Sequence, residues 1–349
     1  MRDERAALLG RLLPEGAPRL WCPLISHYGA DGSFDVARTR AHFARLAPQV
    51  KGFLIPGSTG DGWEMNDAEI RRLLEISLDA AREFNFRLLV GVLKTEIAEV
   101  GATIESISHW LCERTGKTDL TEAMVADRVC GFTVCPPKGR DRSQAELRAA
   151  LQEVLSTGVP VSLYQLPQVT ENEMTPETVA ALASEHANLI LFKDTSGEDR
   201  VARAGVNLDG VFLVRGAEGG YARWPKAGGG PYDGFLLSTA NTFPVELAEV
   251  LDRIAAGDSA GAAELSGRLE RAVERAFAAV AGLKFGNPFA NANKVMDHVM
   301  AFGGAANERP GPLTHAGERL PDAVVGEVCA ILRAEGLMPS GGYLEEGAV

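Results

Sequence analysis

The stretch Asn188-Leu-Ile-Leu-Phe-Lys193-Asp-Thr-Ser-Gly197 is a short apolar run that ends in one lysine and a polar turn. Apolar runs of this length, bounded by turn residues, predict buried strands. A lysine at the mouth of a packed strand loses solvation, and its pKa falls toward the range in which a neutral amine attacks a carbonyl. The alternative is a surface lysine whose apolar stem lies along the end of the strand.

Two further apolar runs end in groups that could serve the same site. The run at 159–167 (VPVSLYQLP) carries Tyr164 near its end, and the run at 52–61 (GFLIPGSTGD) ends in glycines and hydroxyls. Hydroxyls and backbone N–H groups at a strand end are suited to holding a carboxylate. The three run ends together supply an amine, a phenol and an anion cradle.

These runs belong to a regular alternation of strand-like and helix-like segments. Apolar strands separated by amphipathic helices indicate a parallel sheet covered by helices, and eight such units predict a closed (β/α)8 or TIM barrel. A doubly wound open sheet is the alternative architecture. The expected strands are 20–26, 52–57, 87–93, 131–136, 159–166, 189–194, 211–215 and 233–238. The expected helices are 36–47, 67–84, 97–113, 143–156, 176–186, 198–204, 219–227 and 244–256.

The strand signals stop after residue 258, and helical periodicity continues at 262–281, 288–302 and 321–335. We therefore expect a barrel at 1–257 that carries the active site. A C-terminal helical region at 258–349 is expected to pack on the barrel. The segment 114–128 and the stretch Gly228–Gly230 resemble irregular insertions.

Composition excludes several classes of partner. The formal net charge of −12 argues against nucleic acid or an anionic membrane surface as a partner. No apolar run approaches the ~18 residues that span a bilayer, and the N-terminus carries acids in place of a secretory apolar core. The five cysteines are odd in number and scattered, which fits a reducing compartment. These features predict a cytoplasmic protein.

The polar features of the chain fall where a barrel of this type has its active site. Catalytic groups in such barrels come from the carboxyl ends of several strands and from the loops that follow. Lys193, Tyr164, Ser58, Thr59 and the run Ser238-Thr-Ala-Asn241 all fall at expected strand ends. This agreement favours a functional Lys193 over a surface lysine.

Four segments resemble the signature segments of the dihydrodipicolinate synthase / N-acetylneuraminate lyase superfamily. They are Gly57–Asp61, Tyr164–Pro167, Lys193–Gly197 and Gly234–Asn241, which occur in the family's order within about residues 20–332. The resemblance implies a class I aldolase, lyase or dehydratase that forms a Schiff base with pyruvate or another 2-oxo acid. It also implies that no metal or other cofactor is needed, and we expect a homo-oligomer, a dimer or a tetramer.

The resemblance also implies a role for each matching residue. Lys193 would be the Schiff-base lysine and Tyr164 the proton shuttle. Ser58 and Thr59 would hold the substrate carboxylate, and Thr59 would also pass protons to Tyr164. Further substrate contacts are expected at Gly57, Gly216, Leu236 and Ser238.

The chain departs from each branch of the superfamily. Dihydrodipicolinate synthases have an arginine where this chain has Val169, and they have a tyrosine near 136–139 that is absent here. Lysine biosynthesis is therefore not expected. The acidic residue that lyases use on the sugar chain is expected to be replaced around 216–219, so sialic acid is not expected either. Trp63 could pack on the ring or acyl chain of a substrate, or belong to the core.

Several alternatives remain open from the sequence. Lys94 also closes an apolar run and is the rival amine, while the six histidines show no metal-ligand spacing. The reaction could be that of a dehydratase or hydratase-aldolase on a sugar acid or an aromatic 2-oxo acid. An alternative from a different functional class is a barrel that binds an oxo acid but does not catalyse a reaction. The aldehyde or sugar-acid partner is not identified by any motif.

Overall fold

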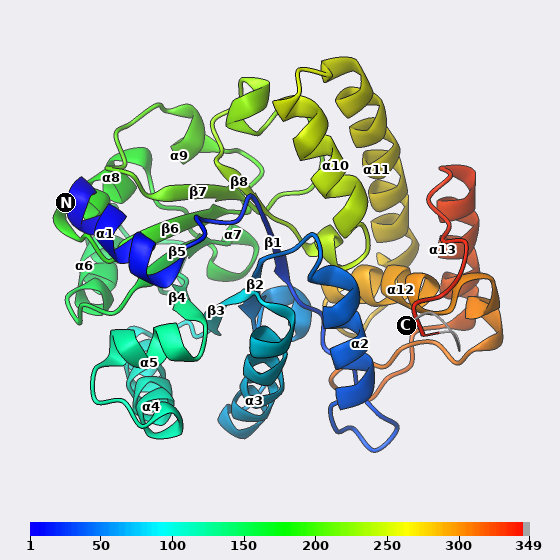
Figure 1. The fold of residues 1–349 in the computed structure, drawn as a ribbon, viewed down its shortest axis with the longest axis horizontal. Helices are drawn as coiled ribbons and strands as arrows, with labels where there is room; N and C mark the ends of the chain where they lie inside the picture. The colour runs from blue at the N-terminus through cyan, green and yellow to red at the C-terminus, as the bar shows by residue number, and fades with distance from the viewer. Residues whose placement is uncertain (345–349) are drawn as a thin grey trace.

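A computed structural model of the chain describes residues 1–344 and shows eight parallel strands that close into a barrel (Figure 1). Each strand pairs with the next, and β8 pairs back onto β1 through Leu20 and Phe235. The predicted barrel is confirmed, and the open-sheet alternative is wrong. The strands are β1 (Leu20–Pro23), β2 (Gly52–Ile55), β3 (Arg87–Val92), β4 (Val129–Val134), β5 (Val161–Gln165), β6 (Leu189–Asp194), β7 (Phe212–Arg215) and β8 (Gly234–Leu236).

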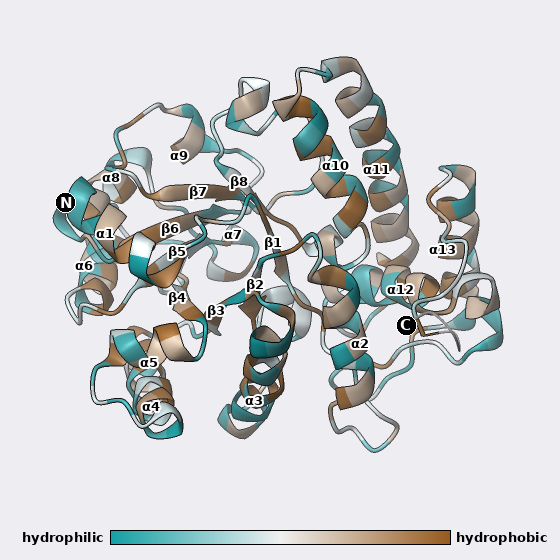
Figure 2. Ribbon diagram, viewed as in Figure 1, coloured by the Kyte–Doolittle hydropathy of each residue, from teal (hydrophilic) through white to brown (hydrophobic). Residues whose placement is uncertain are grey.

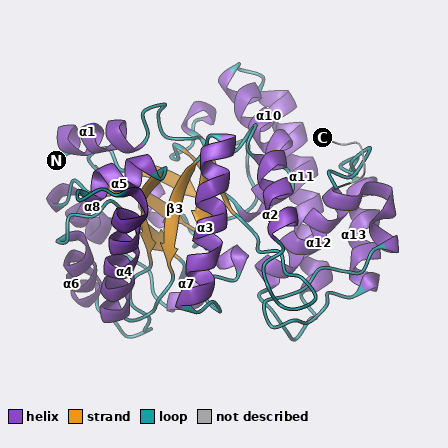
Figure 3. Ribbon diagram, turned by 60° about the horizontal axis from the view of Figure 1, so that its bottom comes forward, coloured by secondary structure: helices purple, strands orange, loops and turns teal. Residues whose placement is uncertain are grey.

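The helices form an outer layer around the strands (Figure 3). In Figure 2 the strands are largely apolar, while the helices combine polar and apolar faces. Helix α3 is an example of such a two-faced helix. A capping box between Asn66 and Glu69 begins it, and its buried residues recur at helical spacing, so they lie on one face. The surrounding helices are α2 (Val36–Leu46), α3 (Asp67–Phe84), α4 (Ile97–Thr115), α6 (Gln144–Leu155), α8 (Pro176–Glu185), α9 (Arg200–Arg203) and α10 (Pro244–Ala255).

The C-terminal region consists of three long helices that lie beside α10 on one side of the barrel (Figure 1). They are α11 (Ser259–Val280), α12 (Pro288–Phe302) and α13 (Asp322–Ala334), close to the expected ranges. Helix α12 contacts the turns that follow β2 and β8, which are η1 (Ser58–Gly60) and η3 (Ser238–Asn241). The last five residues of the expected region, 345–349, lie outside the described residues.

Three local predictions were wrong or incomplete. The segment 114–128 contains helix α5 (Leu120–Ala126), and a four-residue helix α7 (Pro167–Thr170) follows β5. No helix forms over 219–227, because Gly219 and Gly220 have positive φ angles of 84° and 67° that turn the chain. A short 3₁₀ turn, η2 (Lys226–Gly228), follows instead.

An N-terminal helix, α1 (Arg2–Leu12), was not predicted because its sequence is strongly charged. Arg5 explains its position. This fully buried guanidinium donates to the carbonyl oxygens of Leu189 at 2.6 Å, Ala183 at 2.5 Å and His186 at 2.8 Å. Helix α1 is therefore held at the amino end of β6, opposite the end that carries Lys193. Within residues 1–344, no helix has both the length and the apolarity to cross a bilayer.

Candidate active site

A cavity of about 240 Å³ lies at the carboxyl ends of the strands. Its wall includes seven of the eight residues predicted from the sequence, namely Ser58, Thr59, Tyr164, Lys193, Gly216, Leu236 and Ser238. The eighth, Gly57, does not line the cavity and instead packs against Pro23. The barrel thus brings together residues that are up to 180 positions apart, from Ser58 to Ser238.

Lys193 lies near the end of β6 and is 3% exposed. Its register partner on β5 is Tyr164, and its Nζ lies 3.9 Å from the centroid of the Tyr164 ring. Among residues 1–344, no carboxylate forms an ion pair with this amine. Desolvation therefore lowers the pKa of Lys193 to about 7, although the nearby Cys135 and Glu218 oppose that fall. A large share of the amine is unprotonated at neutral pH and can act as a nucleophile.

Tyr164 is 2% exposed, and burial raises the pKa of its phenol, with a smaller opposing effect from the Thr195 hydroxyl. The phenol consequently keeps its proton at neutral pH. In the described part of the chain no hydrogen bond joins Thr59 to Tyr164, so the proton path expected from Thr59 is not preformed. Thr195 also lines the cavity and was missed, although it lies only two residues after Lys193.

Gly216 provides the space that the lysine occupies. A Cβ atom at this position would lie 2.7 Å from Cε of Lys193 and would clash with Oγ1 of Thr195. Real Cβ atoms do not approach other heavy atoms this closely. Glycine is therefore required at position 216 because the side chains of Lys193 and Thr195 fill the space that a Cβ atom would need, and not because of the backbone conformation.

Glu218 lines the same wall and lies within 216–219, where the acid that lyases use on the sugar chain is expected to be replaced. Its carboxylate accepts hydrogen bonds from Oγ of Ser238 at 2.6 Å, Oγ1 of Thr239 at 2.7 Å and the hydroxyl of Tyr221 at 3.0 Å. These donors come from η3, the turn that follows β8, and from the loop that follows β7. They hold the acid in a fixed position at the cavity wall.

The turn that carries Ser58 and Thr59 is anchored from behind by a buried ion pair. Asp61 accepts from Nζ of Lys294 at 2.7 Å and from the hydroxyl of Tyr28 at 3.0 Å. The side chains of Lys294 and Asp61 are 2% and 5% exposed. Burial lowers the pKa of Lys294, and Asp61 opposes that fall. The sequence did not reveal this pair, because 233 positions separate its members.

The mouth of the cavity has an apolar part, formed by two phenylalanines, beside the exposed polar side chain of Gln168. Phe277 from α11 and Phe289 from α12 line it and contact each other edge to face, with ring centroids 5.4 Å apart. Lys193 is the only basic side chain in the described residues that lines the cavity, and Glu218 is the only acidic one. Neither phenylalanine was predicted, because both belong to C-terminal helices.

Lys94, the rival amine, does not line the cavity. Its side chain is 25% exposed, and its Nζ lies 3.5 Å from Asp67. Trp63 and Val169 do not line the cavity either; both pack against a small apolar cluster that includes Tyr164. Trp63 thus contributes to the core beneath the phenol.

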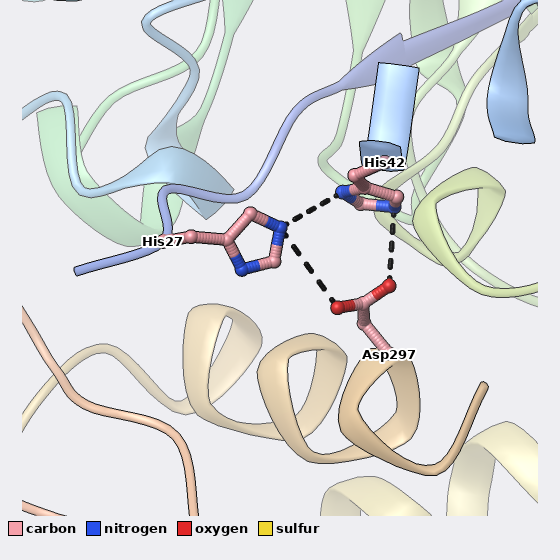
Figure 4. A group of neighbouring side chains, drawn as sticks. All are labelled: His27, His42 and Asp297. Atoms are coloured by element: carbon pink, nitrogen blue, oxygen red, sulfur yellow. Dashed lines mark hydrogen bonds and ion pairs between the residues drawn. The ribbon is translucent and has the colours of Figure 1, made fainter. Parts of the chain in front are cut away.

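Two histidines and an aspartate, dispersed in the sequence, meet in a buried group (Figure 4). His27 Nε2 lies 3.1 Å from His42 Nδ1, and His42 Nε2 lies 3.2 Å from Asp297. These atoms are close enough to surround a metal ion. Arg38, however, lies 3.2 Å from Asp297, and Tyr343 donates to the same carboxylate at 3.0 Å. A further cation would be repelled by Arg38, so the group is better described as a network of hydrogen bonds.

Residues 18–287 match the model of the Dihydrodipicolinate synthetase family. The 4-hydroxy-tetrahydrodipicolinate synthase of Stenotrophomonas maltophilia (strain R551-3) is 30% identical over 251 residues, which cover 71% of this chain and 77% of that protein. The protein of the same name from Xanthomonas campestris pv. campestris is 29% identical over 227 residues, which cover 63% of this chain and 67% of that protein.

Solved structures with the same fold cover nearly the whole chain. YagE, a prophage protein of the dihydrodipicolinic acid synthase family from E. coli K12 in complex with pyruvate, matches with a TM-score of 0.68 and 21% identity over 92% of this chain and 99% of its own. A dihydrodipicolinate synthase from Thermotoga maritima matches with a TM-score of 0.68 and 15% identity over the same shares. At these identities the likeness concerns the fold alone.

Proposed function

Because this chain belongs to the dihydrodipicolinate synthetase family, we propose that it is a lysine-dependent aldolase or lyase acting on pyruvate or a related 2-oxo acid. It makes or breaks a carbon–carbon bond beside the keto group. The observation that carries this proposal is the desolvated amine of Lys193, which lies against Tyr164 in a cavity shared with Ser58 and Thr59. A barrel that only bound an oxo acid would have no use for such an amine.

The residue types fit imine chemistry. Nζ of Lys193 attacks the keto carbon, the keto oxygen leaves as water, and a C=N bond replaces the C=O bond. The protonated imine withdraws electrons and stabilises a carbanion on the adjacent carbon. Tyr164 can give its proton to the departing oxygen and later take a proton back. The hydroxyls of Ser58 and Thr59 hold the substrate carboxylate and fix its orientation.

The second substrate is proposed to be an aldehyde with an uncharged, apolar or aromatic body. Phe277 and Phe289 offer apolar surface at the mouth, and no arginine among residues 1–344 lines the cavity to meet a second carboxylate or a phosphate. Val169, which replaces the arginine of the synthases, packs into the core. These features argue against efficient condensation with aspartate semialdehyde, even though the curated relatives are named as synthases.

A second candidate function uses the same amine. The aromatic mouth formed by Phe277 and Phe289 also favours a hydratase-aldolase or dehydratase that acts on an aromatic 2-oxo acid. The hydratase-aldolase or dehydratase also adds or removes water, whereas the aldolase or lyase only makes or breaks the carbon–carbon bond. A homo-oligomeric state, as a dimer or a tetramer, and a cytoplasmic location stay predictions.

Trapping of the imine tests the proposal. Pyruvate and borohydride should add the mass of one reduced imine to the peptide that contains Lys193. Lys94→Met is the matched control and should be labelled like the natural protein, whereas Lys193→Met should not be labelled. Label on Lys94, or no label, would contradict the proposal. A panel of aliphatic and aromatic aldehydes, assayed by pyruvate consumption, then identifies the second substrate.

A further inference from the structure

A second cavity, of about 270 Å³, lies close to the turn that carries Ser58 and Thr59, because three of its lining residues donate hydrogen bonds to Gly60 and Asp61. The loop after β1, helix α2, helix α12 and the segment 310–319 form its walls. Three cations line it, namely Arg38, Lys294 and Arg319, together with His27. Such a concentration of positive charge is unusual in a chain with a net charge of −12.

The charge that faces this cavity is only partly compensated. Arg38 pairs with Asp297 and Lys294 pairs with Asp61, but neither aspartate lines the cavity. Arg319 donates to the carbonyl oxygen of Gly311 at 2.5 Å and has no carboxylate partner among residues 1–344.

Within the part of the chain that the structure describes, Asp35 is the one acid in the wall of this cavity. Its Oδ1 already accepts from the backbone of Arg38 as the N-cap of α2. Nε of Arg38 is buried and has no hydrogen-bond partner in the described residues. The described side chains in the wall of this cavity thus include three cations and one carboxylate, and one buried N–H of Arg38 has no partner among them.

His27 adds one acceptor to this set of donors. His42 Nε2 faces two acceptors, the carbonyl oxygen of Asn241 at 3.0 Å and Asp297 at 3.2 Å, so that nitrogen carries the proton. His42 Nδ1 must then accept from Nε2–H of His27 at 3.1 Å. The other ring nitrogen of His27, Nδ1, is left as an acceptor, and Figure 4 shows it pointing away from His42 and Asp297. His27 itself is 4% exposed and lines the cavity.

We infer that this second cavity binds a phosphate group, either inorganic phosphate or a small phosphate monoester. The oxygens of the phosphate would accept from Arg38, Arg319 and Lys294, which suit a tetrahedral oxyanion. Its remaining O–H, present in the monohydrogen form, would donate to Nδ1 of His27. Sulfate has the same shape and charge but no O–H at neutral pH, and it therefore lacks this last bond.

The same cavity is connected to the active site by direct hydrogen bonds. Ser26 donates to the carbonyl oxygen of Gly60 at 2.8 Å, and Tyr28 and Lys294 both donate to Asp61. All three donors line the second cavity. A phosphate that accepts a hydrogen bond from Lys294 competes with Asp61 for that amine. The weaker pair with Asp61 then loosens the turn that holds the substrate carboxylate. Occupancy should therefore weaken pyruvate capture at Lys193.

Titration calorimetry with inorganic phosphate at constant ionic strength tests the site itself. Saturable binding is expected, and sulfate should bind at least tenfold more weakly. Arg319→Met should abolish phosphate binding while the protein stays folded, because this exposed side chain makes a single hydrogen bond to the backbone. Arg309→Met removes the same charge at a nearby position outside the cavity and should bind phosphate normally. Absence of saturable binding, or equal binding by Arg319→Met, would overturn the site. Equal affinity for sulfate would overturn the role of His27.

The connection to the active site is tested separately, by borohydride trapping of pyruvate with and without phosphate. This test rests on the proposed imine chemistry, whereas the calorimetric test of phosphate binding does not. Saturating phosphate should raise the pyruvate concentration for half-maximal borohydride trapping by roughly fivefold or more, which corresponds to a typical coupling between sites. Arg319→Met should lose this effect but keep its trapping without phosphate. Persistence of the effect in Arg319→Met would show direct competition in the active site and would overturn the connection. Unchanged trapping of the natural protein would overturn it as well.

Discussion

Replacement of the buried amine by an apolar group of similar length should stabilise the protein. Lys193→Met keeps the contact with the Tyr164 ring and removes a buried amine that has no carboxylate partner among residues 1–344. The folded state lowers the pKa of Lys193 from 10.5 to about 7. In the unfolded chain the pKa of the amine returns to its ordinary value, so protonation of the amine favours the unfolded state. Stability therefore rises with pH over the range in which the unfolded state binds more protons.

The size of the penalty follows from the two pKa values. At about 1.4 kcal/mol for each pH unit, the fall from 10.5 to about 7 costs the folded state roughly 5 kcal/mol below pH 7. The penalty decreases as pH rises, to roughly 3 kcal/mol at pH 8 and less than about 1 kcal/mol at pH 10. Between pH 7 and 10.5 the natural protein therefore gains stability relative to Lys193→Met.

Urea unfolding of both proteins at pH 6, 8 and 10, at equal protein concentration, measures this difference. Lys193→Met should be more stable by about 5 kcal/mol at pH 6, and the gap should nearly close at pH 10. Lys94→Met is the control, because its partly exposed pair with Asp67 should contribute less than about 1 kcal/mol. A gap that is absent at pH 6, or that does not change with pH, would refute the argument from desolvation.

Three further predictions concern the active site and its support. Tyr164→Phe keeps the ring packing but removes the proton donor, so turnover should fall by roughly 10²–10⁴-fold while borohydride trapping at Lys193 persists. Gly216→Ala should abolish trapping without unfolding the barrel, because the added Cβ would lie 2.7 Å from Cε of the lysine. Lys294→Met should lower the free energy of unfolding by about 3–5 kcal/mol because it leaves Asp61 buried and unpaired. The double variant with Asp61→Asn should recover most of the loss, because Asn is neutral, tolerates the φ of 61° at this position and can still accept from Tyr28.

Each of these three predictions would be contradicted by a specific result. Near-normal turnover of Tyr164→Phe would mean that water or the substrate carboxylate moves the proton. Normal trapping by Gly216→Ala would mean that the lysine has another approach to the keto carbon. A double variant as unstable as Lys294→Met alone would show that packing around α12, and not the unpaired charge of Asp61, accounts for the loss.

The sequence was sufficient for the barrel and for most of the residues that meet in the cavity of the candidate active site. The apolar runs that end at Tyr164 and Lys193 are contiguous, and their strand pattern depends on neighbouring residues alone. Once eight strand–helix units are recognised, closure of a parallel barrel brings their carboxyl ends to one face. The positions of Ser58, Thr59 and Ser238 at strand ends then follow without any knowledge of side-chain contacts.

The tertiary structure alone decided what supports and surrounds this centre. Lys294 reaches Asp61 from 233 positions away, and Phe277 and Phe289 reach the cavity mouth from helices that follow the barrel. No local periodicity encodes such contacts, because they depend on where a completed helix lies against the barrel. The same holds for Glu218, whose position is fixed by donors from η3, the turn that follows β8. The apolar pattern that makes a segment a strand or a helix depends on nearby residues and can be predicted from them, whereas the partners of a buried charge are set only when distant elements pack together.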